Sequence, residues 1–172
     1  MAGLVDDPII RVRGLVTRFG THTVHDGLDL DVRRGEIIGV VGGSGTGKSV
    51  LLRAIVGLLK PVAGRIEVFG ESVRDTPEEE YRRLRRRWGV MFQDGALFSS
   101  LTVRQNVEAP MREQLQLDQD LRETLAGIKV RMVGLPENAL ANYPSELSGG
   151  MRKRAGFARA IALDPEIVFL DE

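Results

Sequence analysis

The chain has 172 residues, a length that favours one domain with room for a hydrophobic core. Lysine plus arginine and aspartate plus glutamate number 24 each, so no overall positive field recruits nucleic acid or an acidic membrane. The absence of cysteine excludes disulfides and thiolate metal sites and suits a reducing cytosol. No run approaches the roughly 20 apolar residues that span a bilayer, and Asp6 and Asp7 are unlike a signal peptide. We therefore expect a soluble chain whose membrane role, if it has one, comes through a partner.

Strands dominate the first half of the predicted secondary structure. In chain order we predict strands at residues 9–19, 28–32 and 36–41, a helix at 49–59 and a strand at 65–69. Glycines and Asp26 punctuate the turn between the first two strands, so His22 and His25 are predicted to lie in a turn without a role.

Helices dominate the second half. We predict a helix at residues 78–87, a strand at 89–92, helical structure over 102–142, a helix at 150–163 and a buried strand at 166–170. The alternation of strands and helices predicts an α/β fold with a mainly parallel sheet and right-handed crossovers. The more polar helical stretch is interpreted as an inserted subdomain.

A glycine-rich loop lies between the third predicted strand and the first predicted helix. It comprises Gly42, Gly43, Ser44, Gly45, Thr46, Gly47, Lys48 and Ser49 and fits the pattern G-x-x-x-x-G-K-[ST] at every fixed position. Glycines allow consecutive backbone N–H groups to surround phosphate oxygens at a helix N-terminus. Lys48 is expected to reach the β- and γ-phosphates and the Ser49 hydroxyl to bind Mg²⁺. An ordinary glycine-rich turn is the alternative, and the flanking strand and helix argue against it.

Two carboxylates follow the last predicted strand. Asp171 is expected to hold the water ligands of Mg²⁺, and Glu172 to orient or deprotonate the attacking water. A polar pair entering a turn is the alternative, but the upstream phosphate loop favours the catalytic interpretation. The two motifs together predict a nucleoside triphosphatase that uses Mg²⁺.

A second glycine pair opens the last predicted helix, in the run Leu147, Ser148, Gly149, Gly150 and Met151. A helix N-terminus of this kind is a second anion site. A domain with one phosphate loop does not need it, so we expect it to face a partner's nucleotide across a two-fold interface.

This run closely resembles the signature L-S-G-G-Q of ATP-binding cassette (ABC) ATPases. The phosphate loop, Gln93 after a strand, the signature and the acidic strand occur in the family's order along the whole chain. The resemblance implies a P-loop NTPase (RecA-like) fold over residues 1–172, with an N-terminal antiparallel β subdomain and an inserted helical subdomain at 102–146.

The resemblance also implies roles for single residues. Phe19 matches the aromatic that stacks on adenine, with a core phenylalanine as the alternative. Gln93 matches the glutamine that contacts Mg²⁺ or the water and senses the permease. The stretch from Asp94 to Phe98 would face the permease, although Leu97 and Phe98 also suit buried loop anchors.

Two departures from the family pattern are informative. Met151 replaces the usual signature glutamine, and Pro144, Ser145 and Glu146 precede the motif. This combined run, and the stretch after Gln93, resemble the ATPases of Mla/Mce-type lipid transporters. The resemblance implies a phospholipid cargo, handled through the permease.

The family pattern continues beyond the acidic strand with a D-loop and a switch histidine, which are not in this sequence. We therefore expect a C-terminally truncated fragment that binds nucleotide weakly without turnover. The main hypothesis is the ATPase subunit of an ABC transporter. It would form a homodimer around two ATP molecules on the cytoplasmic face of the plasma membrane and would dock to a permease. No nucleic-acid partner is expected.

Two alternatives remain. A soluble ABC-type ATPase acting on DNA or ribosomes is disfavoured, because about 100 residues separate Lys48 from Ser148 without cysteine or heptads. A cassette that only binds nucleotide is disfavoured by the acidic pair Asp171 and Glu172.

Overall fold

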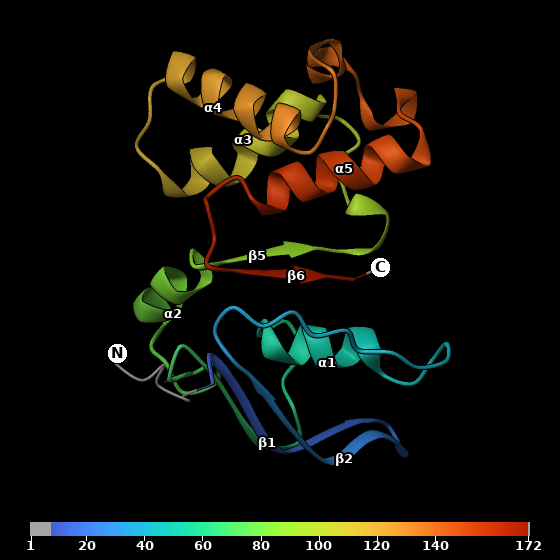
Figure 1. Cartoon of the computed structure of the whole chain (residues 1–172). Coiled ribbons are helices and arrows are strands. Elements are labelled where there is room, and N and C mark those ends of the chain that lie inside the picture. The colour runs from blue at the N-terminus through green and yellow to red at the C-terminus, as the bar shows by residue number, and fades with distance from the viewer. Residues whose placement is uncertain (1–7, 172) are drawn as a thin grey trace, which may run out of the picture. The chain divides into compact units, whose positions relative to one another are not determined.

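The computed structural model describes residues 8–171 and forms two compact units that divide between Tyr81 and Arg82. Figure 1 shows the elements of both units along the chain. No helix among the described residues is both long and apolar enough to cross a bilayer.

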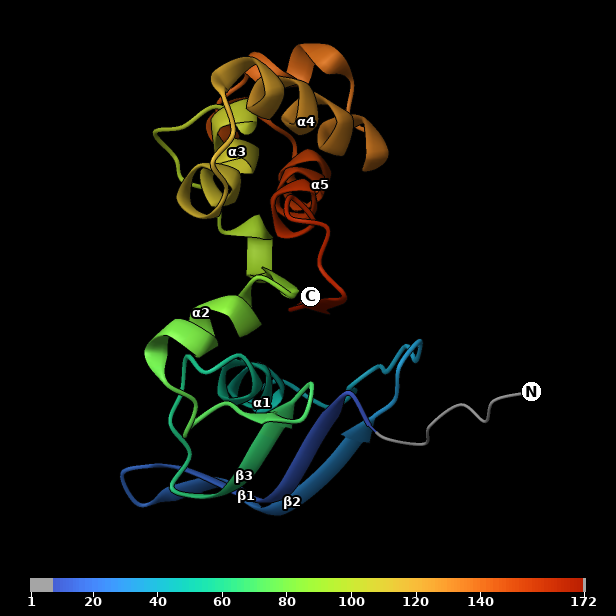
Figure 2. The same ribbon diagram turned by 90° about the vertical axis from the view of Figure 1, so that its left-hand side faces the viewer.

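The first unit is an antiparallel sheet with one helix. Its elements are β1 (Ile10–Phe19), β2 (His22–Val32), α1 (Lys48–Ile55), β3 (Ala63–Val68) and β4 (Glu71–Ser72). The strands lie in the order β2-β1-β3-β4, and α1 lies over one face of the sheet, as Figure 2 shows. The predicted N-terminal antiparallel β subdomain is therefore present.

Alternating side chains explain why β1 lies at the centre of this sheet. Ile10 and Val12 are buried, whereas Arg11 and Arg13 point outward and form ion pairs with acids on the neighbouring strands. A register shift after Val12 restores the alternation, so that Leu15 is again fully buried. A strand with one apolar face needs a covering layer, which α1 supplies.

The second unit consists of three packed helices and a two-stranded parallel sheet. Its elements are β5 (Trp88–Met91), the 3-10 helix η1 (Gln93–Gly95), α3 (Val103–Gln114), α4 (Gln119–Met132), the 3-10 helices η2 (Glu137–Ala141) and η3 (Pro144–Glu146), α5 (Gly149–Ala160) and β6 (Ile167–Leu170). The helix α2 (Glu78–Arg85) runs across the division between the units.

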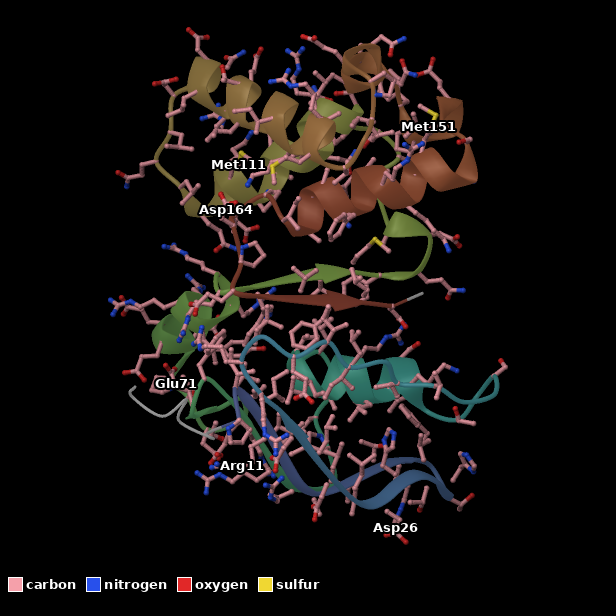
Figure 3. The ribbon with its side chains drawn as sticks, in the orientation of Figure 1. Arg11, Asp26, Glu71, Met111, Met151 and Asp164 are labelled. Atoms are coloured by element: carbon pink, nitrogen blue, oxygen red, sulfur yellow. The ribbon has the colours of Figure 1, made fainter. Side chains whose placement is uncertain are left out.

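Apolar residues at helical spacing form the core of the second unit. Val103, Val107 and Met111 of α3 are fully buried, as are Val130 of α4 and Ala158 of α5. The labelled Met111 of Figure 3 lies in this helical layer. The predicted helical stretch is thus real, although it breaks into α3, α4 and η2. Its assignment as an inserted subdomain at residues 102–146 stays a prediction.

Side-chain caps define where these helices begin. Thr102 accepts a hydrogen bond from the N–H of Gln105, whose own side chain accepts from the N–H of Thr102. Asp118 caps α4 in the same way through the N–H of Leu121. Each cap satisfies N–H groups that the first helical turn cannot pair.

One predicted strand is wrong. Residues 36–41 form no strand, and within them Ile37 and Val41 are 99% and 92% exposed. An apolar run becomes a strand only where neighbouring strands complete its hydrogen-bond ladder. The sheet of the first unit does not include this run.

The last strand exists, but the prediction that it is buried is wrong. Val168 and Leu170 are exposed, whereas Ile167 and Phe169 on the other face are half-buried. Phe169 makes an edge-to-face contact with Trp88 of β5, with ring centroids 6.4 Å apart. The strand therefore has one half-covered face, which carries Ile167 and Phe169, and one exposed face.

The histidines were also misplaced by the sequence prediction. Both His22 and His25 belong to β2, which starts before the predicted boundary. The His25 ring is buried, and its Nδ1 shares a 2.7 Å hydrogen bond with the Thr17 hydroxyl of β1. Burial lowers the pKa of His25, because desolvation disfavours the charged ring.

The burial of His25 predicts that the folded protein loses stability at acidic pH. The unfolded chain binds a proton at His25 near pH 6.5, whereas the folded protein binds it only at lower pH. Stability should therefore be complete above about pH 7.5 and decrease below about pH 6.5, by at most about 1.4 kcal/mol per pH unit. We expect His25→Gln to reduce this dependence in urea unfolding between pH 7.5 and 5.5. His22→Gln, at an exposed position of the same strand, is the control, and equal slopes for both variants would contradict the prediction.

Candidate functional site

The phosphate loop lies between the exposed run 36–41 and α1. Gly42, Gly43 and Thr46 are exposed, and the Thr46 hydroxyl donates a 2.9 Å hydrogen bond to the carbonyl of Gly43. Lys48 opens α1, and its Nζ donates to the carbonyls of Gly42 and Gly43 at 2.8 and 2.9 Å. The ammonium group is therefore folded over the loop that would surround an anion.

Gly47 fixes the end of this loop. Its φ of 95° lies in the left-handed region, and it serves as the N-cap of α1. A Cβ at this position would lie 2.5 Å from Cγ1 of Val24 and 2.8 Å from Nε2 of His25. The loop backbone thus rests directly on β2, which holds the N-terminus of α1 in place.

The groups at this loop fit a phosphate ligand. The exposed loop leads into the N-terminal N–H groups of α1, where a helix favours negative charge. Lys48 adds a positive charge, and the hydroxyl of Ser49 is a hard oxygen donor of the kind that Mg²⁺ prefers. Phe19 is half exposed at the end of β1, so the alternative of a core phenylalanine is not what the structure shows.

The acidic strand lies in the second unit. The N–H of Asp171 donates to the carbonyl of Met91 at 2.9 Å and continues the ladder in which β6 pairs with β5. Its carboxylate therefore follows the C-terminal end of a parallel strand, where ligands bind in open α/β sheets. Glu172 lies outside the described residues.

Gln93 begins the loop of residues 93–98, which follows β5. The side chains of Gln93 and Phe98 are exposed, and Leu97 packs against the helical core. Of the two residues considered as anchors, only Leu97 packs against this core, and it is partly buried there. The loop therefore presents a polar and an aromatic side chain on an anchored backbone.

The signature run forms the N-terminus of α5. Leu147 is buried, and the Ser148 hydroxyl caps the helix by accepting from the N–H of Met151 at 3.3 Å. Gly149 and Gly150 are exposed, so the first helical turn is open to a ligand. Met151 packs against the helical core, and Figure 3 shows it near the start of α5. A methionine at the glutamine position is thus used for packing.

The expected site residues divide between the two units. Phe19 and the phosphate loop belong to the first unit, whereas Gln93, Asp171 and the signature run belong to the second. The magnesium site expected from Ser49, Gln93 and Asp171 needs groups from both units and stays a prediction. Within residues 8–171, no group of three or more acids or histidines forms a ready-made metal cluster.

The sequence analysis missed the residues that support these loops. Val24 and His25 lie under the phosphate loop, and Arg159 binds the loop of residues 93–98 from α5. No local motif marks them. The spacing of Gly156 and Arg159, three residues apart on one helix face, is the sequence signal that could have indicated a contact there.

The close contact at Gly47 makes a testable prediction. Gly47→Ala should destabilise the protein by about 1–3 kcal/mol, because alanine is strained at this φ and its Cβ overlaps Val24 and His25. Gly43→Ala is the matched control, since its Cβ would meet nothing closer than 3.9 Å. Urea unfolding compares the two variants, and equal stabilities would show that β2 does not hold the loop.

Curated relatives extend over most of this chain. It is 41% identical over 164 residues to the intermembrane phospholipid transport ATP-binding protein MlaF of Haemophilus influenzae, covering 95% of this chain and 62% of that protein. It is 40% identical to a probable ribonucleotide transport ATP-binding protein mkl of Mycobacterium leprae, covering 95% and 47%. It is also 40% identical to the methionine import ATP-binding protein MetN of Rhizobium johnstonii, covering 96% and 45%. The chain thus spans about half the length of these relatives.

Solved structures and a family comparison indicate the same kind of protein as the curated relatives do. The dimeric structure of MJ0796, a bacterial ABC transporter cassette, aligns with a TM-score of 0.88 at 29% identity, covering 95% of this chain and 73% of that one. A dimeric post-hydrolysis state of MJ0796 bound to ADP and Pi aligns with a TM-score of 0.87 at 28% identity, covering 95% and 73%. The predicted cassette fold is therefore confirmed. Residues 25–172 match the family described as ABC transporter, and the chain belongs to that family.

Proposed function

We propose that the chain is the ATP-binding cassette of a transporter, in which two copies close around two ATP molecules. The observation that carries the proposal is the phosphate loop, with Lys48 folded over it and Gly47 seated on β2. When a nucleotide binds, Lys48 would release the carbonyls of Gly42 and Gly43 and contact phosphate oxygens instead. Both copies would then close, and hydrolysis would reopen them.

The second phosphate contact would come from the partner copy. The exposed Gly149 and Gly150 and the cap residue Ser148 leave the first turn of α5 accessible. Helix N-terminal N–H groups and a hydroxyl suit a phosphate oxygen. The dimeric cassettes of similar fold support this arrangement.

Mg²⁺ would be held by oxygen groups of this chain. The Ser49 hydroxyl, the Gln93 amide and the Asp171 carboxylate are a suitable donor set. Bound Mg²⁺ would neutralise charge on the phosphates. Glu172 would orient the attacking water, and Phe19 would stack on the base.

A lipid is the cargo that we propose for the transporter. The run from Pro144 to Met151 and the stretch after Gln93 resemble the Mla/Mce-type ATPases, and MlaF is among the similar relatives. Relatives at 40% identity are named for ribonucleotide and methionine transport, so identity alone does not select the cargo. The cassette would work at the cytoplasmic face of the membrane.

The cargo is tested by purification. We would express the complete reading frame with a tag, solubilise membranes in mild detergent and identify bound proteins and lipids by mass spectrometry. A multispanning permease with phospholipid supports the proposal. A preparation bound to ribosomes or DNA would favour the soluble ATPase instead.

The role proposed for Lys48 leads to the first prediction from this proposal. Lys48→Ala should weaken ATP binding about 10- to 150-fold, because it removes charge-assisted contacts worth about 1.5–3 kcal/mol. Titration calorimetry measures the affinity. Lys60→Ala, at an exposed position beyond α1, is the control and should bind as the unmodified protein does. An ATP affinity of Lys48→Ala equal to that of the unmodified protein would contradict the assignment of this loop as the nucleotide site.

Glu172 provides the second. In the protein from the complete reading frame, Glu172→Gln should stop hydrolysis and accumulate a dimer with Mg-ATP, since the closed state can no longer reopen. Light scattering measures the mass with ATP and, as a control, with ADP. A variant that stays monomeric with ATP would contradict the two-copy mechanism.

A further inference from the structure

The loop of residues 93–98 packs against α5 backbone to backbone. Gly95 is buried, and a Cβ added to it would lie 2.7 Å from the carbonyl oxygen of Arg152. A Cβ added to Gly156 would lie 2.5 Å from the Cα of Gly95. Two facing glycines therefore let the loop approach the helix more closely than any side chain would allow.

Arg159, one helical turn after Gly156, binds this loop with both arms of its guanidinium. Nη2 donates to the carbonyl of Gly95 and Nη1 to the carbonyl of Ala96, each at 3.0 Å. The guanidinium carbon also lies 5.5 Å from the centroid of the Phe98 ring, within cation–π range. The planar guanidinium holds its two donors in a fixed geometry and can stack on an aromatic ring, whereas the ammonium of a lysine is a compact charge on a flexible stem and fixes neither contact in this way.

The loop needs such a constraint because its backbone is strained. Asp94 and Ala96 have φ values of 56° and 43°, a region that residues with a Cβ seldom adopt. Conformations of this kind persist only where the surroundings enforce them. Asn106 of α3 supplies the other restraint, since its Oδ1 accepts from the N–H of Phe98 at 2.8 Å and its Nδ2 donates to the Phe98 carbonyl at 3.1 Å.

The position of Arg159 is also desolvated. Its side chain is half-buried, and burial lowers its pKa because the charged guanidinium loses water. The two carbonyls and the ring of Phe98 replace part of that hydration. Removing the guanidinium would leave the carbonyls of Gly95 and Ala96 without these donors.

We infer that Arg159 is a positioning residue that joins the loop of residues 93–98 and α5 into one rigid body. Ser148 lies about 16 Å from Arg159 along this helix, at a rise of about 1.5 Å per residue. A displacement of the loop would therefore also move the N-terminus of α5, where the signature run lies. That second step rests on the proposed function, in which a permease docks on the loop and Ser148 faces the partner's ATP.

Hydrogen exchange tests the rigid body itself. In Arg159→Ala, the amides of residues 93–98 should exchange at least about tenfold faster. Local opening of the loop then costs less free energy, because it no longer has to break the hydrogen bonds from Arg159 to the carbonyls of Gly95 and Ala96. Arg159→Lys should not restore protection, whereas Phe98→Leu should lose part of it. Arg154→Ala is the matched control, because Arg154 lies on the same helix and donates to the carbonyl of Gly134 instead. Unchanged exchange in Arg159→Ala would overturn the inference.

Reconstitution tests the coupling. With the complete reading frame and its permease in liposomes, Arg159→Ala should keep its KM for ATP and lose permease-stimulated kcat about fivefold or more. Arg154→Ala should retain both values. Full stimulation in Arg159→Ala, together with faster exchange of the loop, would overturn the coupling step. Absence of any permease stimulation in the unmodified protein would instead contradict the proposed function, and the exchange experiment would still decide the role of Arg159.

Discussion

Close packing at glycine positions, where a Cβ would overlap a neighbouring group, is a constraint that both units share. In the first unit, Gly47 seats the phosphate loop on β2. In the second, a Cβ on Gly89 of β5 would lie 2.0 Å from the carbonyl oxygen of Ala160, and Gly95 meets Gly156 further along α5. The parallel strand and the loop that follows it are therefore aligned along a single helix.

The phosphate loop and the signature run show two ways of building an anion site from a helix. At α1 the cap residue is a glycine without a side chain, and a lysine supplies the charge. At α5 the cap is the hydroxyl of Ser148, and the helix supplies the polarity. The first site combines the polarity of a helix N-terminus with a cation, whereas the signature run contains no cation of its own. This difference is consistent with one primary and one complementary phosphate contact.

Local patterns predicted the elements that depend on local interactions. The periodicity around Val107 and Val130 and the glycines at the start of α5 indicated helices that the structure contains. The prediction of a strand at residues 36–41 was wrong because strand formation depends on neighbouring strands, about which a local sequence pattern carries no information. His25 was misplaced since its burial follows from Thr17 and Gly47, which are distant in sequence. Arg159 escaped notice for the same reason, and the catalytic grouping of residues from both units remains a prediction.

The parallel pairing of β5 with β6 also bears on the order of events during synthesis. Arg87 and Glu166, which form an ion pair beside this ladder, are separated by 79 positions. The intervening α3 and α4 are neighbours in the chain and pack on each other, so this contact can form before β6 is translated. Strand β5 must then wait, with its ladder edge open, until β6 has been translated. A chaperone that acts on nascent chains would find its exposed target at Trp88–Met91 during that interval.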